Sequence, residues 1–172
     1  MIIISLKEVT HSQQHEYAHK LLEACLNKTG VPANTEFSFG KYGKPYIFDS
    51  EVYFNLSHAT GISACCVYKN ECGIDAEKIR EYRPNVVKRV FSEKESAAFE
   101  LANEEEKNVI FFKLWTLKES YVKAIGIGVS YPLNTVEFQF NGEKIITNIV
   151  GYAFKQYVID NTFVVSICKK ME

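Results

Sequence analysis

The longest run of apolar positions at helical spacing lies at residues 110–125. These side chains recur every three or four residues, as on one buried face of a helix; they are Ile110, Leu114, Leu117, Tyr121 and Ile125. We therefore predict one long helix that ends at Gly126. A second face of this helix carries Trp115, Glu119 and Lys123, each four residues after the last. Within a helix, a carboxylate one turn before an ammonium is the favoured order for an ion pair. This face therefore fits either a salt bridge or a reaction that involves charged groups.

The rest of the pattern predicts two shorter helices and a series of strands. The helices are expected at 12–29 and 93–102, where polar capping residues precede periodic apolar ones. Short runs rich in β-branched and aromatic residues indicate strands at 2–6, within 36–68, and at 72–77, 134–140, 144–152, 157–159 and 163–168. Asn141-Gly142 is a strong hairpin signal. This order predicts an α+β fold of two similar halves, 1–70 and 71–172, each with a helix and antiparallel strands and with a cleft between them.

Composition adds few constraints. The chain is 47% hydrophobic and 24% charged, and its formal net charge is −1, so no overall field attracts nucleic acid or an anionic membrane. The apolar run at the N-terminus is too short for a signal or membrane segment. Five cysteines without zinc-type spacing are interpreted as reduced thiols of a cytoplasmic protein. His11, His15 and His19 have the spacing of a helical metal site, but nothing completes the ligand set, which disfavours metal binding there.

The first candidate site residues are a pair of acids in the predicted strand at 72–77. Asp75 and Glu77 are two residues apart, so both carboxylates project from the same face of an extended segment. They repel each other unless a cation, a proton or a basic side chain lies between them. Their oxygens suit a hard ion such as Mg²⁺, which also binds substrate phosphate. A solvated strand edge is the alternative, because Asp-x-Glu is a common triplet.

Three other stretches place polar groups at turns or helix ends. Lys44 lies in a Tyr-Gly-Lys-Pro turn, and Ser57-His58 ends a strand with a hydroxyl and an imidazole, although an ordinary turn also explains that pair. Ser92 and Glu95 fit a capping box at the start of a helix. Glu95 therefore has a structural role, while the same helix N-terminus can also receive a phosphate.

Together these stretches resemble the 4′-phosphopantetheinyl transferases, specifically the single-chain, pseudo-dimeric type that activates peptide and polyketide synthases. The matching motifs occur in the family's order and are Gly43-Lys44-Pro45, Phe54-Asn55-Leu56-Ser57-His58, Gly73-Ile74-Asp75-Ala76-Glu77, Phe91-Ser92-x-x-Glu95 and Trp115-Thr116-Leu117-Lys118-Glu119-Ser120-x-x-Lys123-Ala124. The specific signature is Gly-Ile-Asp-x-Glu, followed roughly forty residues later by Trp-x-x-Lys-Glu-Ser-x-x-Lys.

The resemblance implies a reaction and a metal site. The family moves the 4′-phosphopantetheine arm of coenzyme A onto a serine hydroxyl of a carrier protein and releases 3′,5′-ADP. By resemblance, Asp75, Glu77 and Glu119 hold Mg²⁺ against the coenzyme A pyrophosphate, which Lys123 also contacts. The general base that takes the serine proton is Glu119 or Glu95, and the sequence does not choose between them.

The resemblance also implies contacts with the two substrates. The residues expected to contact coenzyme A are Lys20, Lys44, Ser57, His58, Ser92 and Lys123. The basic run at 80–89 directly follows the predicted metal strand, and we expect it to attract the acidic surface of an acyl or peptidyl carrier protein. Because one chain supplies both sides of the cleft, we expect a monomer.

A transferase narrowed to one carrier, such as a fatty-acid synthase protein, is an alternative within the same activity, and two other functions remain as alternatives. One is an inert module that binds coenzyme A or a carrier protein with the same fold. The presence of Asp75, Glu77, Glu119 and Lys123 argues against it, because a decayed site would be expected to lose at least one of them. The other is a Mg²⁺-dependent nucleotide hydrolase, for which the sequence offers no motif that positions water.

Overall fold

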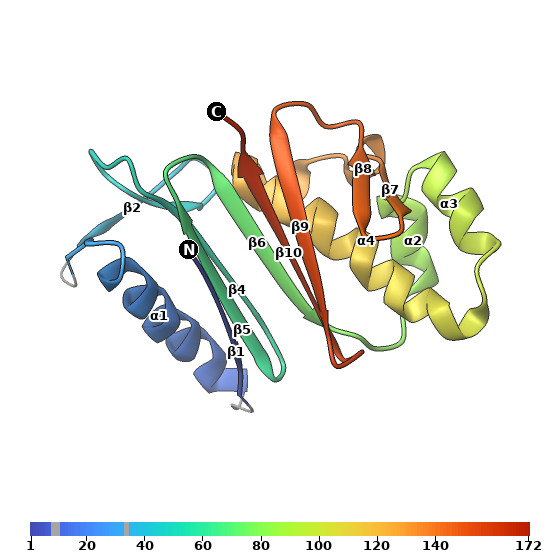
Figure 1. Cartoon of the computed structure of the whole chain (residues 1–172), viewed down its shortest axis with the longest axis horizontal. Coiled ribbons are helices and arrows are strands. Elements are labelled where there is room, and N and C mark those ends of the chain that lie inside the picture. Colours follow the sequence, from blue (N-terminus) through green and yellow to red (C-terminus); the bar gives the residue numbers. More distant parts are fainter. Residues whose placement is uncertain (8–10, 33–34) are drawn as a thin grey trace.

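The computed structural model describes residues 1–7, 11–32 and 35–172 and has an α+β architecture. Two three-stranded antiparallel sheets lie beside each other, and a helix packs on each sheet (Figure 1). The first sheet consists of β1 (Ile2–Leu6), β4 (Tyr53–Ala59) and β5 (Ile62–Tyr68), with helix α1 (His11–Asn27) packed on it. The second consists of β6 (Cys72–Lys78), β9 (Tyr152–Ile159) and β10 (Phe163–Lys170), with helix α4 (Glu104–Ile125) packed on it.

The two sheets share one strand order. The orders are β1-β5-β4 and β6-β10-β9, so in each sheet the first strand lies at an edge and the last strand lies in the centre. A small hairpin accompanies each sheet: β2 (Phe37–Phe39) pairs with β3 (Pro45–Ile47), and β7 (Phe138–Asn141) pairs with β8 (Lys144–Thr147). One such sheet and one such hairpin thus lie on each side of residue 70, which falls in the connection between β5 and β6.

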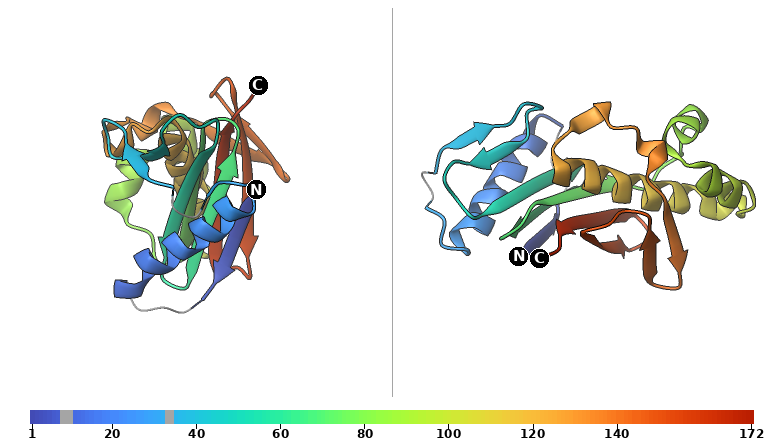
Figure 2. Two further views of the ribbon diagram at one scale, coloured as in Figure 1. Left: turned by 90° about the vertical axis from the view of Figure 1, so that its left-hand side faces the viewer. Right: turned by 90° about the horizontal axis from the view of Figure 1, so that it is seen from above.

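The second half contains additional helical segments. Helices α2 (Pro84–Val90) and α3 (Glu93–Glu100) come between β6 and α4, and two 3₁₀ turns, Gly128–Ser130 and Leu133–Thr135, follow α4. Two further views show α4 running along β6 and β10, with α2 and α3 at the end away from α1 (Figure 2). Within the described part of the chain, no helix is both long and apolar enough to span a membrane.

The strand boundaries predicted between residues 134 and 159 were partly wrong. The strand expected at 144–152 is split, because β8 ends at Thr147 and β9 begins only at Tyr152, while the run at 157–159 is the end of β9. The run at 134–140 begins as a 3₁₀ turn and becomes a strand only at Phe138. The Asn148 side chain accepts a hydrogen bond from Glu137 N (3.0 Å) and donates one to Thr135 O (3.1 Å). This local bonding competes with a strand ladder. A hairpin forms at the predicted place, but its loop residues are Gly142 and Glu143, because Asn141 pairs with Lys144 as the last residue of β7.

The two sheets share part of their core, and this determines which side chains of β6 face α4. Ile74 and Ala76 are buried in a cluster with side chains of β5 and β10. Because side chains alternate along a strand, Gly73, Asp75 and Glu77 project from the opposite face of β6. Helix α4 packs against β6. Asp75 and Glu77, which were predicted to share one face of the strand, therefore lie next to this helix.

Gly73 permits the close contact between α4 and β6. A Cβ atom built on Gly73 would overlap Ser120 O and Ala124 N, and it would lie 2.9 Å from Lys123 C. All three are backbone atoms of α4 and cannot rotate away. Any residue with a side chain at this position therefore forces the helix and the strand apart.

We predict that Gly73→Ala lowers the free energy of unfolding by about 3 kcal/mol or more, because overpacking against backbone is not relieved by a rotamer change. Urea unfolding followed by circular dichroism measures this. Gly40→Ala is the matched control, since its added Cβ meets only Lys44 O at 3.6 Å. Equal stability of the two variants would contradict the close-contact explanation.

Candidate functional site

The candidate site lies where β6 faces the last turns of α4. Lys123 Nζ donates to Asp75 Oδ1 at 2.7 Å and to Ser57 Oγ at 3.0 Å. Glu119 lies one helical turn before Lys123 and is partly buried. The ion-pair partner of Lys123 among the described residues is therefore Asp75 of the strand, and not Glu119 of its own helix as the sequence suggested.

The site concentrates negative charge in a partly buried position. Burial raises the pKa of Glu119 to about 7; the neighbouring Asp75 and Glu77 add to this rise, and Lys123 opposes part of it. Burial also raises the pKa of Glu77, against the effect of a hydrogen bond from Arg80. The three carboxylates carry more negative charge than their basic neighbours neutralise. This excess favours the binding of a proton or a cation.

One carboxylate oxygen in the site has no hydrogen-bond partner among the residues that the structure describes. Asp75 is 5% exposed, and its Oδ2 atom is buried without a hydrogen bond, while Oδ1 has two donors. A buried, unpaired carboxylate oxygen is costly, and a bound cation is one way to satisfy it. The set of carboxylate oxygens from Asp75, Glu77 and Glu119 has the chemistry that a hard divalent cation prefers.

Two basic side chains occupy the carboxylates in the present arrangement. Lys123 is bound to Asp75, and Arg80 donates to Glu77 Oε2 at 2.7 Å. Among the residues that the structure describes, no three ligand-type side chains are grouped closely enough to hold a metal ion in this arrangement. The donor types and the unpaired Asp75 Oδ2 atom fit a divalent cation, and Lys123 and Arg80 engage the other atoms Asp75 Oδ1 and Glu77 Oε2.

Lys44 and Ser57, both expected to contact coenzyme A, lie at the seam between the two halves. Lys44 Nζ donates to Cys72 O (3.0 Å) at the start of β6 and to Ala124 O (2.7 Å) in the last turn of α4. An ammonium at a helix C-terminus is favoured by the helix dipole. Ser57 Oγ lies among Asp75, Ala76 N and Lys123. Both side chains thus hold elements of the site in place.

Glu95 and Ser92 lie in a separate buried network. The predicted capping box is confirmed: Ser92 Oγ accepts from Glu95 N (3.2 Å), and Glu95 Oε2 accepts from Ser92 N (2.8 Å). The other oxygen, Oε1, accepts from Phe138 N at 2.8 Å. Lys118 is fully buried and forms an ion pair with Glu95 Oε2 at 2.6 Å. Both carboxylate oxygens of Glu95 are therefore engaged, which fits a structural role that ties α3, α4 and β7 together.

The two other expected coenzyme A contacts lie near helix α1. Lys20 is exposed and paired with Glu16 at 2.6 Å on the same helix. His58 is exposed at the end of β4, and its ring lies edge-on to that of His15, with 6.5 Å between ring centroids. His15 and His19 are within 3.2 Å of each other through their Nε2 atoms, whereas the His11 side chain lies outside the described part of the structure.

Sequence reasoning missed the roles of two buried polar residues, one at the site and one in the separate network of Glu95. Asn55 is buried and accepts a hydrogen bond from Ile74 N of β6 at 2.9 Å. The sequence did offer a signal for Asn55, because it lies two residues before Ser57 on a strand whose neighbouring positions are buried. Lys118 was named only as part of the signature motif, whereas in the structure its buried ammonium bonds to Glu95 and to two backbone carbonyls.

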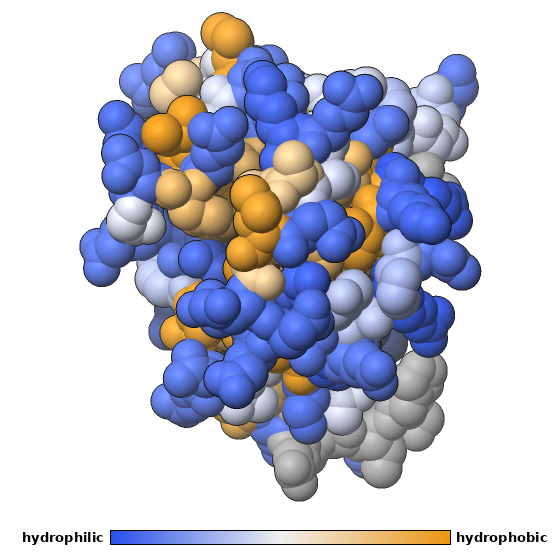
Figure 3. Space-filling view, turned by 90° about the vertical axis from the view of Figure 1, so that its right-hand side faces the viewer, coloured by the Kyte–Doolittle hydropathy of each residue, from blue (hydrophilic) through white to orange (hydrophobic). Residues whose placement is uncertain are grey.

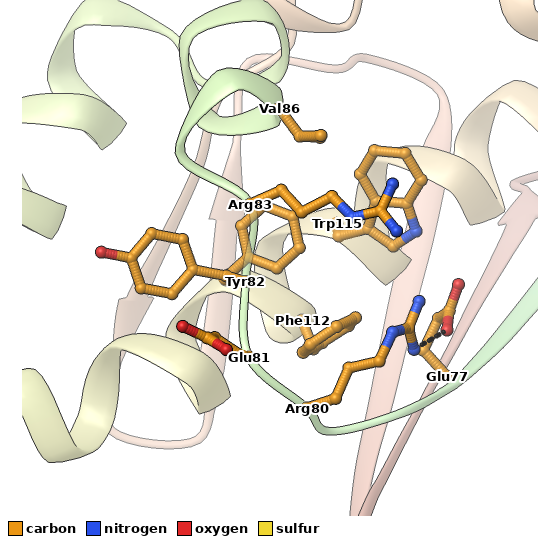
Figure 4. A pocket seen from close by; sticks show the side chains of 9 residues that line it. Glu77, Arg80, Glu81, Tyr82, Arg83, Val86, Phe112 and Trp115 are labelled. Carbon is orange, nitrogen blue, oxygen red and sulfur yellow. Dashed lines mark hydrogen bonds and ion pairs between the residues drawn. The ribbon is translucent and has the colours of Figure 1, made fainter.

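A cleft opens beside the carboxylates. It has a volume of about 210 Å³, and the residues that line it include Glu77, Arg80, Arg83, Phe112 and Trp115. Figure 4 shows Arg80 between Glu77 and the Phe112 ring, to whose centroid its guanidinium carbon lies 4.8 Å away. A neighbouring cleft of about 320 Å³ is lined by residues that include Glu119, Trp115 and Arg89. Trp115 thus borders both openings.

Comparison with known proteins shows one consistent similarity. Residues 71–168 match the family model described as the 4′-phosphopantetheinyl transferase superfamily. A 4′-phosphopantetheinyl transferase of Aneurinibacillus migulanus is 36% identical over 102 residues, which is 59% of this chain and 43% of that protein. One of Bacillus subtilis is 31% identical over 143 residues, or 80% of this chain and 64% of that protein. The chain therefore spans less than two thirds of the length of these relatives. The solved Thermotoga maritima holo-[acyl-carrier-protein] synthase covers 59% of this chain and 64% of its own, at 19% identity and a TM-score of 0.47.

The raised pKa of Glu119 gives a prediction on stability. The ordinary value is 4.5 and the folded value is about 7, so between these pH values the folded state binds more protons than the unfolded state. The free energy of unfolding therefore falls as the pH rises through this window. In metal-free buffer, we expect Glu119→Gln to gain about 2 kcal/mol relative to the unsubstituted protein between pH 5 and pH 8.

Urea unfolding at both pH values measures this difference. Glu143→Gln, at an exposed position in the β7–β8 turn, is the control and should follow the unsubstituted protein at both pH values. Parallel pH profiles of Glu119→Gln and the unsubstituted protein would contradict the prediction.

Proposed function

Since this chain belongs to the 4′-phosphopantetheinyl transferase superfamily, we propose that it transfers the 4′-phosphopantetheine group of coenzyme A to a serine of an apo acyl or peptidyl carrier protein. The reaction is Mg²⁺-dependent and releases 3′,5′-ADP. The observation that carries the proposal is the contact of the two signature motifs: Asp75 of β6 meets Lys123 of α4, and the buried Asp75 Oδ2 remains without a partner.

The three carboxylates are the proposed metal ligands. Asp75, Glu77 and Glu119 would hold Mg²⁺, which when bound neutralises the negative charge of the coenzyme A pyrophosphate. The excess negative charge of the site and the raised pKa of Glu77 and Glu119 support this assignment. Lys123 supplies an ammonium beside the same carboxylates and is the proposed contact to the pyrophosphate.

Glu119 is the proposed general base. The carrier serine oxygen forms a bond to the phosphorus that bears pantetheine, the bond from that phosphorus to the bridging oxygen breaks, and 3′,5′-ADP leaves with the electron pair. The serine proton goes to Glu119. Glu95 is the weaker candidate, because backbone amides and Lys118 engage both of its oxygens.

The coenzyme A contacts divide into two groups. His58 and Lys20 are exposed and remain proposed contacts to its phosphates. Lys44, Ser57 and Ser92 each have partners within the protein, and their present contacts favour a supporting role.

We propose that the carrier protein docks over the basic segment that follows β6. Arg83 lines the cleft beside Glu77, and Arg89 lines the cleft beside Glu119, so positive side chains border both approaches to the carboxylates. The end of the molecule that carries α3 is mostly hydrophilic, with apolar side chains in small groups among polar ones (Figure 3). Such a surface suits attraction between opposite charges more than a large apolar interface.

We also propose that the protein acts as a cytoplasmic monomer in the activation of peptide or polyketide synthases. The five cysteines are free and buried, which supports a reducing compartment. One chain supplies both sheets, and residues of both halves meet at Asp75. An inert module that binds coenzyme A or a carrier is the alternative, and the intact carboxylate set counts against it.

A mass-spectrometric assay tests the proposed reaction. The protein is incubated with coenzyme A, Mg²⁺ and a panel of apo carrier proteins, and intact masses are recorded. We expect a gain of one phosphopantetheine group on at least one carrier, and a rate about 100-fold lower for Glu119→Gln. Coenzyme A binding without any transfer across a broad panel would favour the inert module instead.

A charge-reversal experiment tests the docking surface. We predict that Arg83→Glu with Arg89→Glu raises the apparent KM for the carrier about tenfold and leaves the affinity for coenzyme A unchanged. Lys144→Glu with Lys155→Glu is the control, because it makes the same change in net charge at exposed positions of β8 and β9. If both pairs change the KM equally, the effect is one of net charge and the docking surface is elsewhere.

A further inference from the structure

Strand β6 has an unusual partner on its free edge. On one side it forms an antiparallel ladder with β10, and on the other it lies beside β4, which belongs to the other sheet. Two side chains of β4 bridge this gap: Asn55 Oδ1 accepts from Ile74 N at 2.9 Å, and Ser57 Oγ accepts from Ala76 N at 3.1 Å. We call these two residues the Asn55–Ser57 clamp.

The clamp takes the place of backbone pairing. Asn55 and Ser57 are two residues apart, as are the amides they bind, so β4 and β6 run in the same direction in a fixed register. Both clamp residues are at least nine-tenths buried. Without them the N–H groups of Ile74 and Ala76 would be buried donors without partners, which is strongly unfavourable.

Asp75 lies between the two clamped amides. Ser57 Oγ also donates to Asp75 Oδ1 at 3.1 Å and accepts from Lys123 Nζ at 3.0 Å. A hydroxyl has one proton to donate and two lone pairs, so the hydrogen-bonding capacity of Ser57 is fully used. These contacts engage Oδ1 and leave Oδ2 as the unpaired oxygen of Asp75.

We propose that Asn55 and Ser57 are positioning residues that set the cation affinity of the site by holding β6 in register against α4. This inference rests on the proposed function, because it takes Asp75, Glu77 and Glu119 as cation ligands. Asn55 is the more informative member of the clamp. Its bond goes to the backbone of Ile74, so it acts on the ligands only through the position of the strand.

The test measures Mn²⁺ binding, since Mn²⁺ prefers the same carboxylate ligands as Mg²⁺ and is detected directly by electron paramagnetic resonance. We expect Asn55→Ala to raise the dissociation constant for Mn²⁺ about tenfold, the low end of the effect of residues that orient ligands. Ser57→Ala should have at least this effect, and Ser57→Thr, which retains the hydroxyl, should bind as the unsubstituted protein does. All titrations are run well below the unfolding transition.

Gln156→Ala is the matched control. Gln156 is also an amide that bridges elements of the core: its Nε2 donates to Lys113 O and to Ser166 Oγ, each at 2.8 Å, and among the described residues none of its hydrogen bonds goes to β6. We expect this variant to lose stability as Asn55→Ala does and to keep the Mn²⁺ affinity of the unsubstituted protein. Amide hydrogen exchange without metal supplies a second measurement, in which Asn55→Ala should accelerate exchange at Ile74.

The outcomes separate the inference from the proposed function. If the unsubstituted protein does not bind Mn²⁺, the proposed metal site is wrong and the inference fails with it. If the unsubstituted protein binds Mn²⁺ and Asn55→Ala binds it as tightly as Gln156→Ala does, only the clamp is overturned. Unchanged exchange at Ile74 in Asn55→Ala would likewise overturn the clamp.

Discussion

Because Gly73 has no side chain, the backbone of α4 contacts β6 directly, and this contact determines where the charged groups of the site lie. Asp75 and Glu77 lie two and four residues after Gly73 on the strand, and Glu119 and Lys123 lie four residues apart on the helix. Two regular elements held this close bring the four side chains together without any loop. The position of the site therefore depends on a residue that takes no part in its chemistry.

Local sequence patterns predicted the elements of the site, but not the contacts between them. The three-and-four spacing at 110–125 and the alternation at 72–77 each depend on near neighbours in the chain, and so does the capping box of Ser92 and Glu95. The partner of Lys123 depends on which strand lies beside the helix, and the roles of Asn55 and Lys44 depend on which edge of one sheet meets the other. Such long-range pairings leave no periodic signal. The strand expected at 144–152 failed for a related reason, since Asn148 bonds to a neighbouring loop and interrupts the ladder.

Two ion pairs formed by lysines of α4 show how similar residues take different roles. Lys118 and Glu95 are both fully buried. Both carboxylate oxygens of Glu95 and the ammonium of Lys118 have further hydrogen-bond partners, as a stable buried pair requires. Lys123 and Asp75 are paired as closely, but Lys123 is partly exposed and one Asp75 oxygen has no partner. The first pair can only hold elements together. The second retains unused bonding capacity next to two more carboxylates, which is the property expected of a site that binds a ligand.

The two halves share one strand order, but their corresponding elements carry different residues. In the first half, the edge strand β1 has the sequence IIISL and carries no acid, whereas its counterpart β6 carries Asp75 and Glu77. Helix α4 supplies Glu119 and Lys123, so the second half provides all the charged groups at the centre of the site. The first half instead contributes groups that bond to the backbone of the second, with Lys44 at the end of α4 and Asn55 and Ser57 along β6. Among the described residues, the second half thus carries the charged groups of the candidate site, and the first half contacts the backbone that holds them in place.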